Sequence, residues 1–431
     1  MQNEYLAIYG AFAAAGVALH VFMRRRRERK AAAAHEAATL AGLNEPASLH
    51  PMVNASRCIG SGGCVKACPE EALGIVNGRA VLVNAASCIG HGACRAACPV
   101  EAITLVFGTE RRGVDIPTVS PDFESNVPGI FIAGELGGMG LIRKAAEQGK
   151  QAIAAIRRRK AAPGELDVVI VGAGPAGISA GLAAKEHGLR FRLIEQEDSL
   201  GGTVSHYPRN KIAMTAPIKL ALVGTVRMTA ISKERLIAFW NRVVGDTALE
   251  LHFRERMERV ERDGDSFVVH TSAGQWRTRS VLLAIGRRGT PRTLGVAGED
   301  LQKVVYRLVD PEQYAGMAVL VVGGGDSALE AAVAVAAQPN TRVTLSYRGA
   351  AFNRVKQANR QALDEAVREG RIDLQLETQV DAITPTEVTL RGAGQPVVLP
   401  NEAVIVCAGG ILPVALLQQM GIEFQTKHGS A

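Results

Sequence analysis

The stretch Asp167-Val-Val-Ile-Val-Gly-Ala-Gly-Pro-Ala-Gly177 decides the fold of a large part of this chain. Its apolar first half is typical of a buried strand, and three glycines follow it in the spacing Gly-x-Gly-x-x-Gly. In this pattern Gly172 makes the tight turn, Gly174 lets a pyrophosphate approach the backbone, and Gly177 allows close contact between helix and strand. The stretch therefore predicts a dinucleotide-binding turn.

The residues that follow complete a Rossmann-type unit. An apolar segment over 178–187 predicts a helix, and 190–194 predicts a second strand that ends at Glu195. Glu195 stands where an acidic side chain would bind the ribose of an adenosine. The combination of strand, glycine turn, helix and acid is far more specific than the glycines alone.

A second unit of the same kind lies further along the chain. Ala318–Val322 predicts a strand, and Gly323-Gly-Gly325-Asp326-Ser327-Ala328 predicts the turn and the start of a helix. Ser346 stands at the position that matches Glu195, and Arg348 is close by. Because an acid is missing and a cation is near, the second unit favours NADP(H) over NAD(H).

Two such units in one chain resemble the pyridine-nucleotide:disulfide oxidoreductase class. The resemblance implies an α/β fold with two Rossmann-like domains, the first for FAD and the second for NAD(P)H. Further segments agree with it, namely Gly201-Gly202-Thr203 in a loop like that of thioredoxin-reductase-like and bacillithiol-reductase-like enzymes, and Gly286 at a crossing between domains. The cysteine pair with which many members of the class exchange disulfides is missing.

One motif of the class is out of order. The class closes its chain with a strand that ends in Gly-Asp and a helix that points at the flavin. Here the match is Pro128-Gly-Ile-Phe-Ile-Ala-Gly134-Glu135, with 141–156 as the helix, and it precedes the first Rossmann unit. We interpret this as a circular permutation, in which Gly134 and Glu135 contact FAD. The alternative is an ordinary strand–helix linker.

Six of the seven cysteines form two copies of one pattern. The first runs from Cys58 to Pro69 and the second from Cys88 to Pro99, with an offset of thirty residues throughout. Each resembles the two-cluster bacterial ferredoxin motif, C-x2-C-x2-C-x3-C-P, and implies a small α+β ferredoxin-like domain with two iron–sulfur clusters. In that family the last cysteine of each run serves the other cluster. The implied ligand sets are Cys58, Cys64 and Cys98 for one cluster, and Cys88, Cys94 and Cys68 for the other.

Both copies depart from the ferredoxin motif at its second cysteine. Ser61 replaces it in the first copy and His91 in the second, so each cluster could be 3Fe-4S or 4Fe-4S, with His91 a candidate ligand. Zinc and disulfides are the competing interpretations. Zinc normally takes four ligands from C-x2-C knuckles, and disulfides are rare in a reducing compartment.

The N-terminal segment predicts one transmembrane helix. Tyr5–Met23 holds no formal charge and is long enough to cross a hydrocarbon core, and the basic run Arg24–Lys30 follows it. Positive flanks stay cytoplasmic, so this predicts a single-pass protein of the inner cell membrane with its N-terminus outside. A soluble alanine-rich helix and an interfacial anchor are the alternatives. The small-residue pair Gly10 and Ala14 makes a homodimer a candidate assembly.

Composition excludes several other classes. With 47% hydrophobic and 21% charged residues, the chain is neither disordered nor a multi-span transporter. Arg24–Lys30 and Arg157–Lys160 carry +5 and +4 of the net +7, so the remainder is slightly acidic and no nucleic-acid partner is expected. The predicted domains are an anchor over 1–30, a stalk over 31–52, the ferredoxin-like domain over 53–107, the permuted strand and helix over 108–160, the first part of the FAD domain over 161–290, the NAD(P)H domain over 291–405 and a return to the FAD domain over 406–431.

Three functions are compatible with these parts. The first is a membrane-anchored flavoprotein that moves electrons between NAD(P)H, FAD and iron–sulfur clusters to an unidentified acceptor, similar to a ferredoxin–NADP reductase fused to its own ferredoxin. The second is a flavin-dependent reductase of a small disulfide or other small substrate. The third is a non-catalytic redox sensor at the membrane. Because the cofactors carry the chemistry, no catalytic side chain is assigned.

Overall fold

The computed structural model describes residues 2–40, 46, 49–68, 70–88, 90, 92–110, 113–138, 140–159, 161–209, 211–215, 217–228, 230–287, 290–352, 355–411 and 413–429. The chain divides into two compact units. The smaller comprises residues 1–114, 353–358 and 427–431, and the larger comprises residues 115–352 and 359–426.

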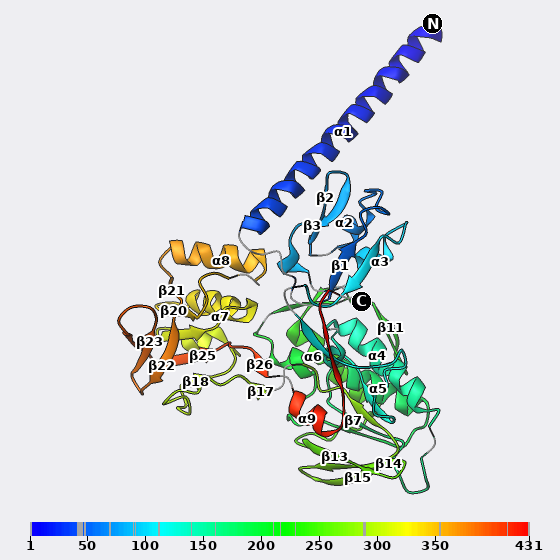
Figure 1. Cartoon of the computed structure of the whole chain (residues 1–431), viewed down its shortest axis with the longest axis vertical. Helices are drawn as coiled ribbons and strands as arrows, with labels where there is room; N and C mark the ends of the chain where they lie inside the picture. The colour runs from blue at the N-terminus through cyan, green and yellow to red at the C-terminus, as the bar shows by residue number, and fades with distance from the viewer. Residues whose placement is uncertain are drawn as a thin grey trace. The chain divides into compact units, whose positions relative to one another are not determined.

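The smaller unit combines one long helix with a small cysteine-bearing domain (Figure 1). In that domain β1 pairs antiparallel with β4, and β2 pairs antiparallel with β3. The elements are α1 (Gln2–Leu40), β1 (His50–Val53), α2 (Gly63–Ala67), β2 (Leu73–Val76), β3 (Arg79–Leu82), η1 (Ala85–Ser87), α3 (Ala93–Ala96) and β4 (Ile103–Val106).

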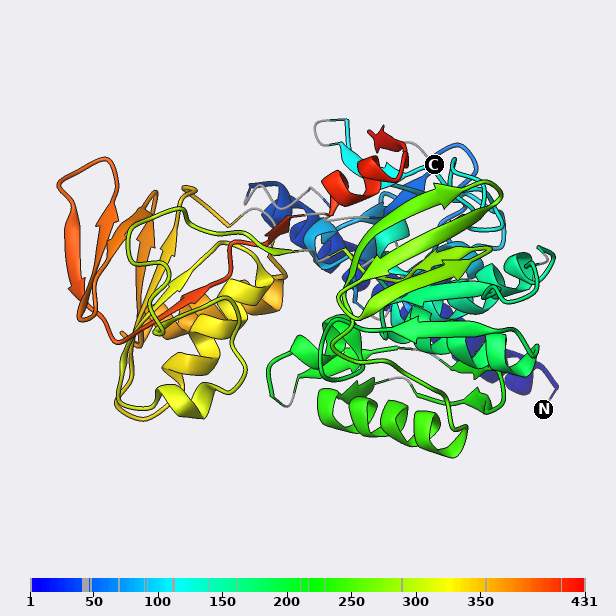
Figure 2. The ribbon, with the colours of Figure 1, turned by 90° about the horizontal axis from the view of Figure 1, so that it is seen from below.

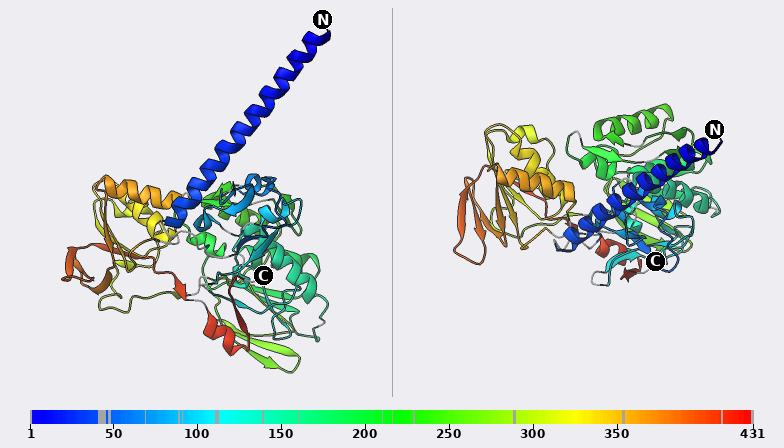
Figure 3. Two further views of the ribbon diagram at one scale, coloured as in Figure 1. Left: turned by 45° about the horizontal axis from the view of Figure 1, so that its top comes forward. Right: turned by 90° about the horizontal axis from the view of Figure 1, so that it is seen from above.

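Helix α1 is continuous to Leu40, and its second half packs on the β2–β3 hairpin, as Figures 1 and 3 show. The Glu28 carboxylate accepts a hydrogen bond of 2.7 Å from the backbone N–H of Gly78 in the hairpin turn. At Gly74 an added Cβ would lie 2.7 Å from the Cβ of Ala31, so the missing side chain lets the helix approach the strand. The first half of the helix, from Tyr9 onward, is exposed wherever its side chains are described.

The predicted transmembrane helix is wrong. None of the helices within the described residues is both long enough and apolar enough to cross a membrane. The segment Tyr5–Met23 lacks charge, but it holds six alanines, two glycines, two tyrosines and His20, which favour insertion into a bilayer less than leucine, isoleucine, phenylalanine or valine do. This finding removes the basis for the predicted membrane partner and for the predicted single-pass location in the inner membrane.

The larger unit contains a parallel sheet with the strand order β6-β16-β7-β8. Its strands are β6 (Ile130–Ile132), β16 (Val281–Leu283), β7 (Val168–Val171) and β8 (Phe191–Ile194). Strand β16 pairs in parallel with β6 on one side and with β7 on the other. Strand β6 comes before the first Rossmann unit in the sequence. It is nevertheless part of the same sheet as β7, as a circular permutation requires.

Helices α4 (Ile142–Ile156) and α5 (Pro175–Glu186) cover one face of this sheet, where their alanines and isoleucines join one apolar core. The two helices meet where α4 carries Gly149, because a Cβ there would lie only 2.1 Å from the carbonyl oxygen of Ala176. The opposite face packs against an antiparallel layer, which Figure 2 shows in yellow-green, and against the C-terminal helix. That layer is β13 (Met257–Asp263), β14 (Ser266–Thr271) and β15 (Gly274–Thr278), and the helix is α9 (Val414–Gln419).

Short elements surround this core. They are β5 (Val114–Pro117), which pairs with β27 (Phe424–Lys427), η2 (Glu135–Gly137), η3 (Gly202–His206), β9 (Ile212–Met214), β10 (Ile218–Leu220), β11 (Gly224–Val226), β12 (Ala230–Ser232), α6 (Lys233–Asp246), and β17 (Thr290–Pro291), which pairs with β26 (Gly410–Ile411).

A second parallel sheet has the order β18-β25-β19-β20-β21. Its strands are β18 (Val304–Val305), β25 (Ala403–Val406), β19 (Ala318–Val322), β20 (Arg342–Tyr347) and β21 (Ile372–Leu376). The remaining elements are η4 (Pro311–Tyr314), α7 (Asp326–Ala336), α8 (Gln357–Arg368) and an antiparallel sheet of β22 (Gln379–Ile383), β23 (Glu387–Arg391) and β24 (Val397–Pro400). The two parallel sheets agree with the predicted α/β fold with two Rossmann-like units.

Candidate cofactor sites

The first glycine turn is closed by backbone contacts that no larger residue would allow. Gly172 follows β7 with a φ of +103°, and a Cβ there would lie 2.6 Å from the carbonyl oxygen of Ala284 at the end of β16. At Gly177 a Cβ would lie 1.8 Å from the carbonyl oxygen of Gly172 itself. Both glycines are therefore required by the fold of the turn, as the pattern predicts.

Two further predicted segments converge on this turn. A Cβ at Gly202 would lie 3.1 Å from the Cα of Gly174, and the N–H of Gly201 donates to the carbonyl oxygen of Ala173 at 2.9 Å. From the permuted segment, a Cβ at Gly134 would lie 3.1 Å from the Cβ of Ala176. The result is a cradle of bare backbone beside the N-terminus of α5, where a phosphate group would be favoured.

Gly286 and Thr203 belong to the same cradle. A Cβ at Gly286 would lie 3.9 Å from the hydroxyl oxygen of Thr203. The residues after strand β16 and the loop after Gly201 thus lie close together at the cradle.

Two carboxylates lie at the edges of the cradle. Glu195 is 7% exposed, and its carboxylate accepts hydrogen bonds from the N–H groups of Ala173, at 2.7 Å, and of Glu197, at 3.1 Å. Glu135 begins η2 and is half-buried. Its charge acts on the guanidinium of Arg287, whose pKa is lowered by burial, with Glu135 opposing that shift. Sequence reasoning missed Arg287, although it directly follows Gly286.

The second glycine turn has the same construction. Gly323 follows β19 with a φ of +146°, and a Cβ there would lie 2.4 Å from the carbonyl oxygen of Cys407 after β25. Gly325 has open space around it, and Ser327 is exposed. Asp326 begins α7 and accepts a hydrogen bond of 2.7 Å from the Asn359 side chain. The N-terminus of α7 is therefore accessible to a nucleotide.

The predicted residues at the end of β20 do not all face the same way. Ser346 is fully buried, and its hydroxyl lies 2.8 Å from that of Thr378, so its side chain does not reach the open edge of the turn. Arg348 is exposed. Sequence reasoning gave no role to Tyr347, whose ring stacks on Phe352 at 5.1 Å between centroids and lies directly against Gly324. In the sequence, the signal that could have identified Tyr347 was an aromatic residue between Ser346 and Arg348.

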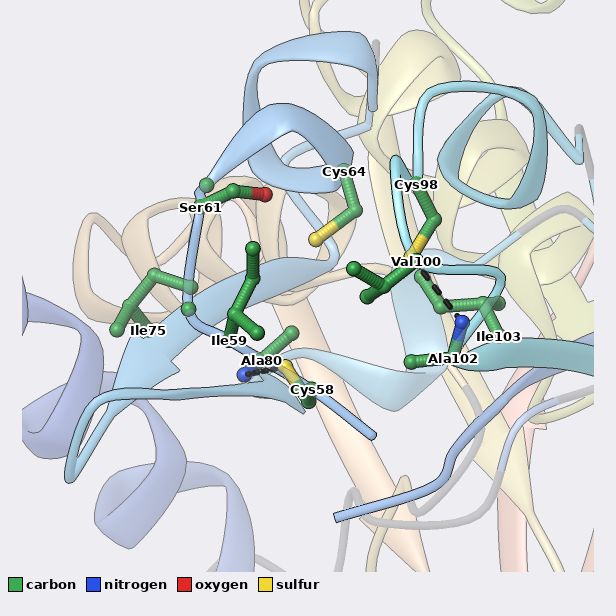
Figure 4. A pocket seen from close by; sticks show the side chains of 12 residues that line it. Cys58, Ile59, Ser61, Cys64, Ile75, Ala80, Cys98, Val100, Ala102 and Ile103 are labelled. Carbon is green, nitrogen blue, oxygen red and sulfur yellow. Dashed lines mark hydrogen bonds between the residues drawn. The ribbon is translucent and has the colours of Figure 1, made fainter. Parts of the chain in front are cut away.

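The cysteines gather around two separate cavities in the small domain. The first is lined by Cys58, Cys64 and Cys98 together with Ser61, and Figure 4 shows these side chains from close by. The Cys58 sulfur accepts a hydrogen bond of 3.4 Å from the N–H of Ala80, and the Cys98 sulfur one of 3.3 Å from that of Ala102.

The second cavity is lined by Cys68, Cys88 and Cys94. The last cysteine of each run thus lies with the first two cysteines of the other run. This grouping matches the two ligand sets that the ferredoxin resemblance implies. His91 lies outside the described residues.

The thiols are held where they do not ionise easily without a cation. Burial is the main cause that raises the pKa of Cys64, of Cys88 and of Cys94, the last to about 11. Neighbouring thiols add to this, because like charges placed close together disfavour ionisation. Binding of an iron–sulfur cluster would favour ionisation of these thiols, since metal ligation needs the thiolate form.

The spacing of the thiols suits a cluster. Among the described residues, no three His, Cys, Asp or Glu side chains converge closely enough to hold a single metal ion. In each cysteine set the side chains instead surround a cavity, and backbone N–H groups point at two of the sulfurs, as around iron–sulfur clusters. The residues present therefore fit iron–sulfur clusters, and the glycine cradle fits the pyrophosphate of a dinucleotide.

These parts define a flavoprotein oxidoreductase with an iron–sulfur domain. The chain belongs to the pyridine nucleotide-disulphide oxidoreductase family, whose pattern matches residues 169–430. Residues 50–99 match the 4Fe-4S dicluster domain.

Similar proteins agree with this assignment. The ferredoxin–NADP reductase of Ignicoccus hospitalis is 28% identical over 61% of this chain and 83% of that protein. The bacilliredoxin reductase Bdr of Bacillus subtilis is 26% identical over 61% of this chain and 82% of that protein. Among solved structures, the bacillithiol disulfide reductase Bdr (YpdA) from Staphylococcus aureus shares the fold, with a TM-score of 0.54 and 24% identity over 60% of this chain and 81% of that one.

Proposed function

We propose that the protein moves electrons between NAD(P)H, FAD and two iron–sulfur clusters. The observation that carries the proposal is the pair of thiol-lined cavities in a chain that also holds two dinucleotide folds. A flavin can exchange two electrons with a nicotinamide and single electrons with a cluster. The similar ferredoxin–NADP reductase suggests that the acceptor or donor is an iron–sulfur protein, here replaced by a domain of the same chain.

The chain's own residues would bind and orient these groups. Gly172, Gly174 and Gly177 leave bare backbone for the FAD pyrophosphate, and Glu195 lies beside that turn to accept from the ribose. Glu135 would hold the flavin side chain from the permuted segment. The two sets of three cysteines would hold the clusters, and N–H groups such as those of Ala80 and Ala102 would favour the reduced state by donating to sulfur.

An anaerobic titration of the purified protein with NADPH tests the proposal. Visible absorption follows the flavin and the clusters, and EPR follows the unpaired electrons of the clusters. We expect both absorption bands to bleach as NADPH is added. A flavin that is fully reduced while the clusters stay oxidised over the same period would contradict electron transfer between them.

NADP(H) is the nucleotide that we propose for the second unit. The carboxylate that would repel a 2′-phosphate is replaced by Ser346, which is buried, and the exposed cation of Arg348 stands two residues further on. A guanidinium recognises a phosphate with paired hydrogen bonds.

Arg348→Gln is therefore expected to weaken NADPH binding about tenfold or more, and NADH binding much less. Losing a hydrogen bond to a charged group costs about 1.5–3 kcal/mol, which corresponds to that factor. The rate of flavin reduction at increasing concentrations of each nucleotide measures both affinities. Arg342→Gln, at the other end of β20 and also exposed, is the matched control. Equal weakening of both nucleotides by Arg348→Gln would remove this residue from phosphate recognition.

Reduction of a small disulfide at the flavin is the second candidate function. The similarity to the bacilliredoxin reductase Bdr favours it, and the larger unit carries no cysteine pair of its own. Variants that lack the clusters, such as Cys64→Ala with Cys94→Ala, separate the two functions. NADPH-dependent turnover of a low-molecular-weight disulfide that survives in this variant would support the second candidate.

A further inference from the structure

The two cysteine cavities are related by the thirty-residue repeat. Beyond the cysteines, Ala102 in the first cavity corresponds to Ala72 in the second, and Ile103 corresponds to Leu73. The repeat therefore extends from the cysteines to the walls, and each lining position of one cavity can be compared with its counterpart in the other.

One described pair breaks this correspondence in charge. Val100 lines the first cavity, and Glu70 takes the equivalent place in the second, each two residues after the last cysteine of its run. The second cavity thus has a carboxylate where the first has an aliphatic side chain. Position 61 in the first cavity carries a serine, and its counterpart is His91, which the structure does not describe.

Among the described residues, none forms an ion pair that balances the charge of Glu70. Glu70 is half-buried, and within the described parts of the chain no cation or hydrogen-bond donor pairs with its carboxylate. Glu70 lines the cavity together with Cys68, Cys88 and Cys94, and these thiols would be anions once they bind iron. A carboxylate placed among three thiolates is costly unless a cation lies between them.

We propose that Glu70 is the fourth protein ligand of the iron–sulfur cluster held by Cys68, Cys88 and Cys94. The inference rests on the proposed function, because it requires that these cysteines bind a cluster. The carboxylate would donate an oxygen lone pair to the iron that lacks a cysteine and displace water from it, with no change in oxidation state. Three thiolates and one carboxylate carry the same charge as the four thiolates of an ordinary 4Fe-4S site. The first cavity, with Val100, has no such ligand.

Glu70→Gln tests the proposal, because the amide keeps the size of the side chain and removes its charge. We expect the purified variant to lose about one iron per chain and to gain the EPR signal of an oxidised 3Fe-4S cluster. Glu71→Gln is the matched control, since Glu71 is the next residue and is exposed. Conversely, Val100→Glu should add about one iron per chain at the first cavity.

The outcomes separate this proposal from its competitors. Iron content and spectra of Glu70→Gln that equal those of Glu71→Gln would overturn it. Loss of iron in His91→Ala with none in Glu70→Gln would also overturn it and would assign the fourth ligand to the histidine. If the unaltered protein binds no iron–sulfur cluster under anaerobic reconstitution, the proposed function fails. This result differs from failure of the Glu70 proposal, in which the protein binds clusters and Glu70→Gln leaves their iron content unchanged.

Discussion

Gly149→Ala is expected to destabilise the larger unit by about 1–3 kcal/mol and to lower its flavin content. In an ordinary helix the same change stabilises by about 1 kcal/mol, so its sign is informative. The reason for the reversal is the close approach of α4 to α5, where the new methyl group would lie 2.1 Å from the carbonyl oxygen of Ala176 in the proposed FAD turn. Urea unfolding followed by circular dichroism measures the stability, and flavin absorbance measures the cofactor content.

Gly245→Ala is the matched control for this prediction. Gly245 lies in α6 with no atom within 4 Å of an added Cβ, so alanine should be neutral or stabilising there. If Gly149→Ala behaved like Gly245→Ala, the permuted helix would not pack on the FAD unit as the structure places it.

Cys98→Ala is expected to abolish the same cluster as Cys58→Ala, and Cys68→Ala the same cluster as Cys94→Ala. The reason is the exchange of the last cysteines between the two cavities. Each variant should lose roughly half of the bound iron, because one cluster is left without three thiolates. EPR of the reduced protein identifies the surviving cluster, and the spectra should fall into two pairs.

The seventh cysteine provides the control for these variants. Cys407 lies after β25 in the larger unit, away from both cysteine runs in sequence, so Cys407→Ala should keep all of the iron. Spectra that pair Cys98→Ala with Cys94→Ala instead would show that each run holds its own cluster.

The glycine turns and the two groups of cysteines could be predicted because each depends on the spacing of residues that are close together in the sequence. Gly172 and Gly177 contact backbone that approaches too closely for any side chain, and such contacts permit only glycine. The cysteine runs repeat with a fixed offset, so one known arrangement accounts for both. The place of β6 followed from a motif that was complete but stood in the wrong part of the chain.

Other features depended on more than spacing. Tyr5–Met23 was uncharged and long, but length without charge does not make a segment apolar enough to span a bilayer. Glu70 lies outside the cysteine motif, so only the folded cavity brings it beside the thiols. Ser346 occupied the expected position in sequence, but its hydroxyl contacts Thr378, which follows the neighbouring strand β21, so the contact depends on the pairing of β20 with β21.

The place of β6 in its sheet also determines the order in which parts of the protein can fold during synthesis on the ribosome. Strand β6 ends at Ile132 and has β16 as its parallel neighbour, which begins only at Val281. At about 5–20 residues per second, the ribosome needs roughly 7–30 s to make the intervening chain. During that time the edge of β6 that pairs with β16 has no partner, whereas the four strands of the cysteine domain, which all precede Phe107, have already been made. The newborn chain can therefore acquire its iron before it can enclose its flavin.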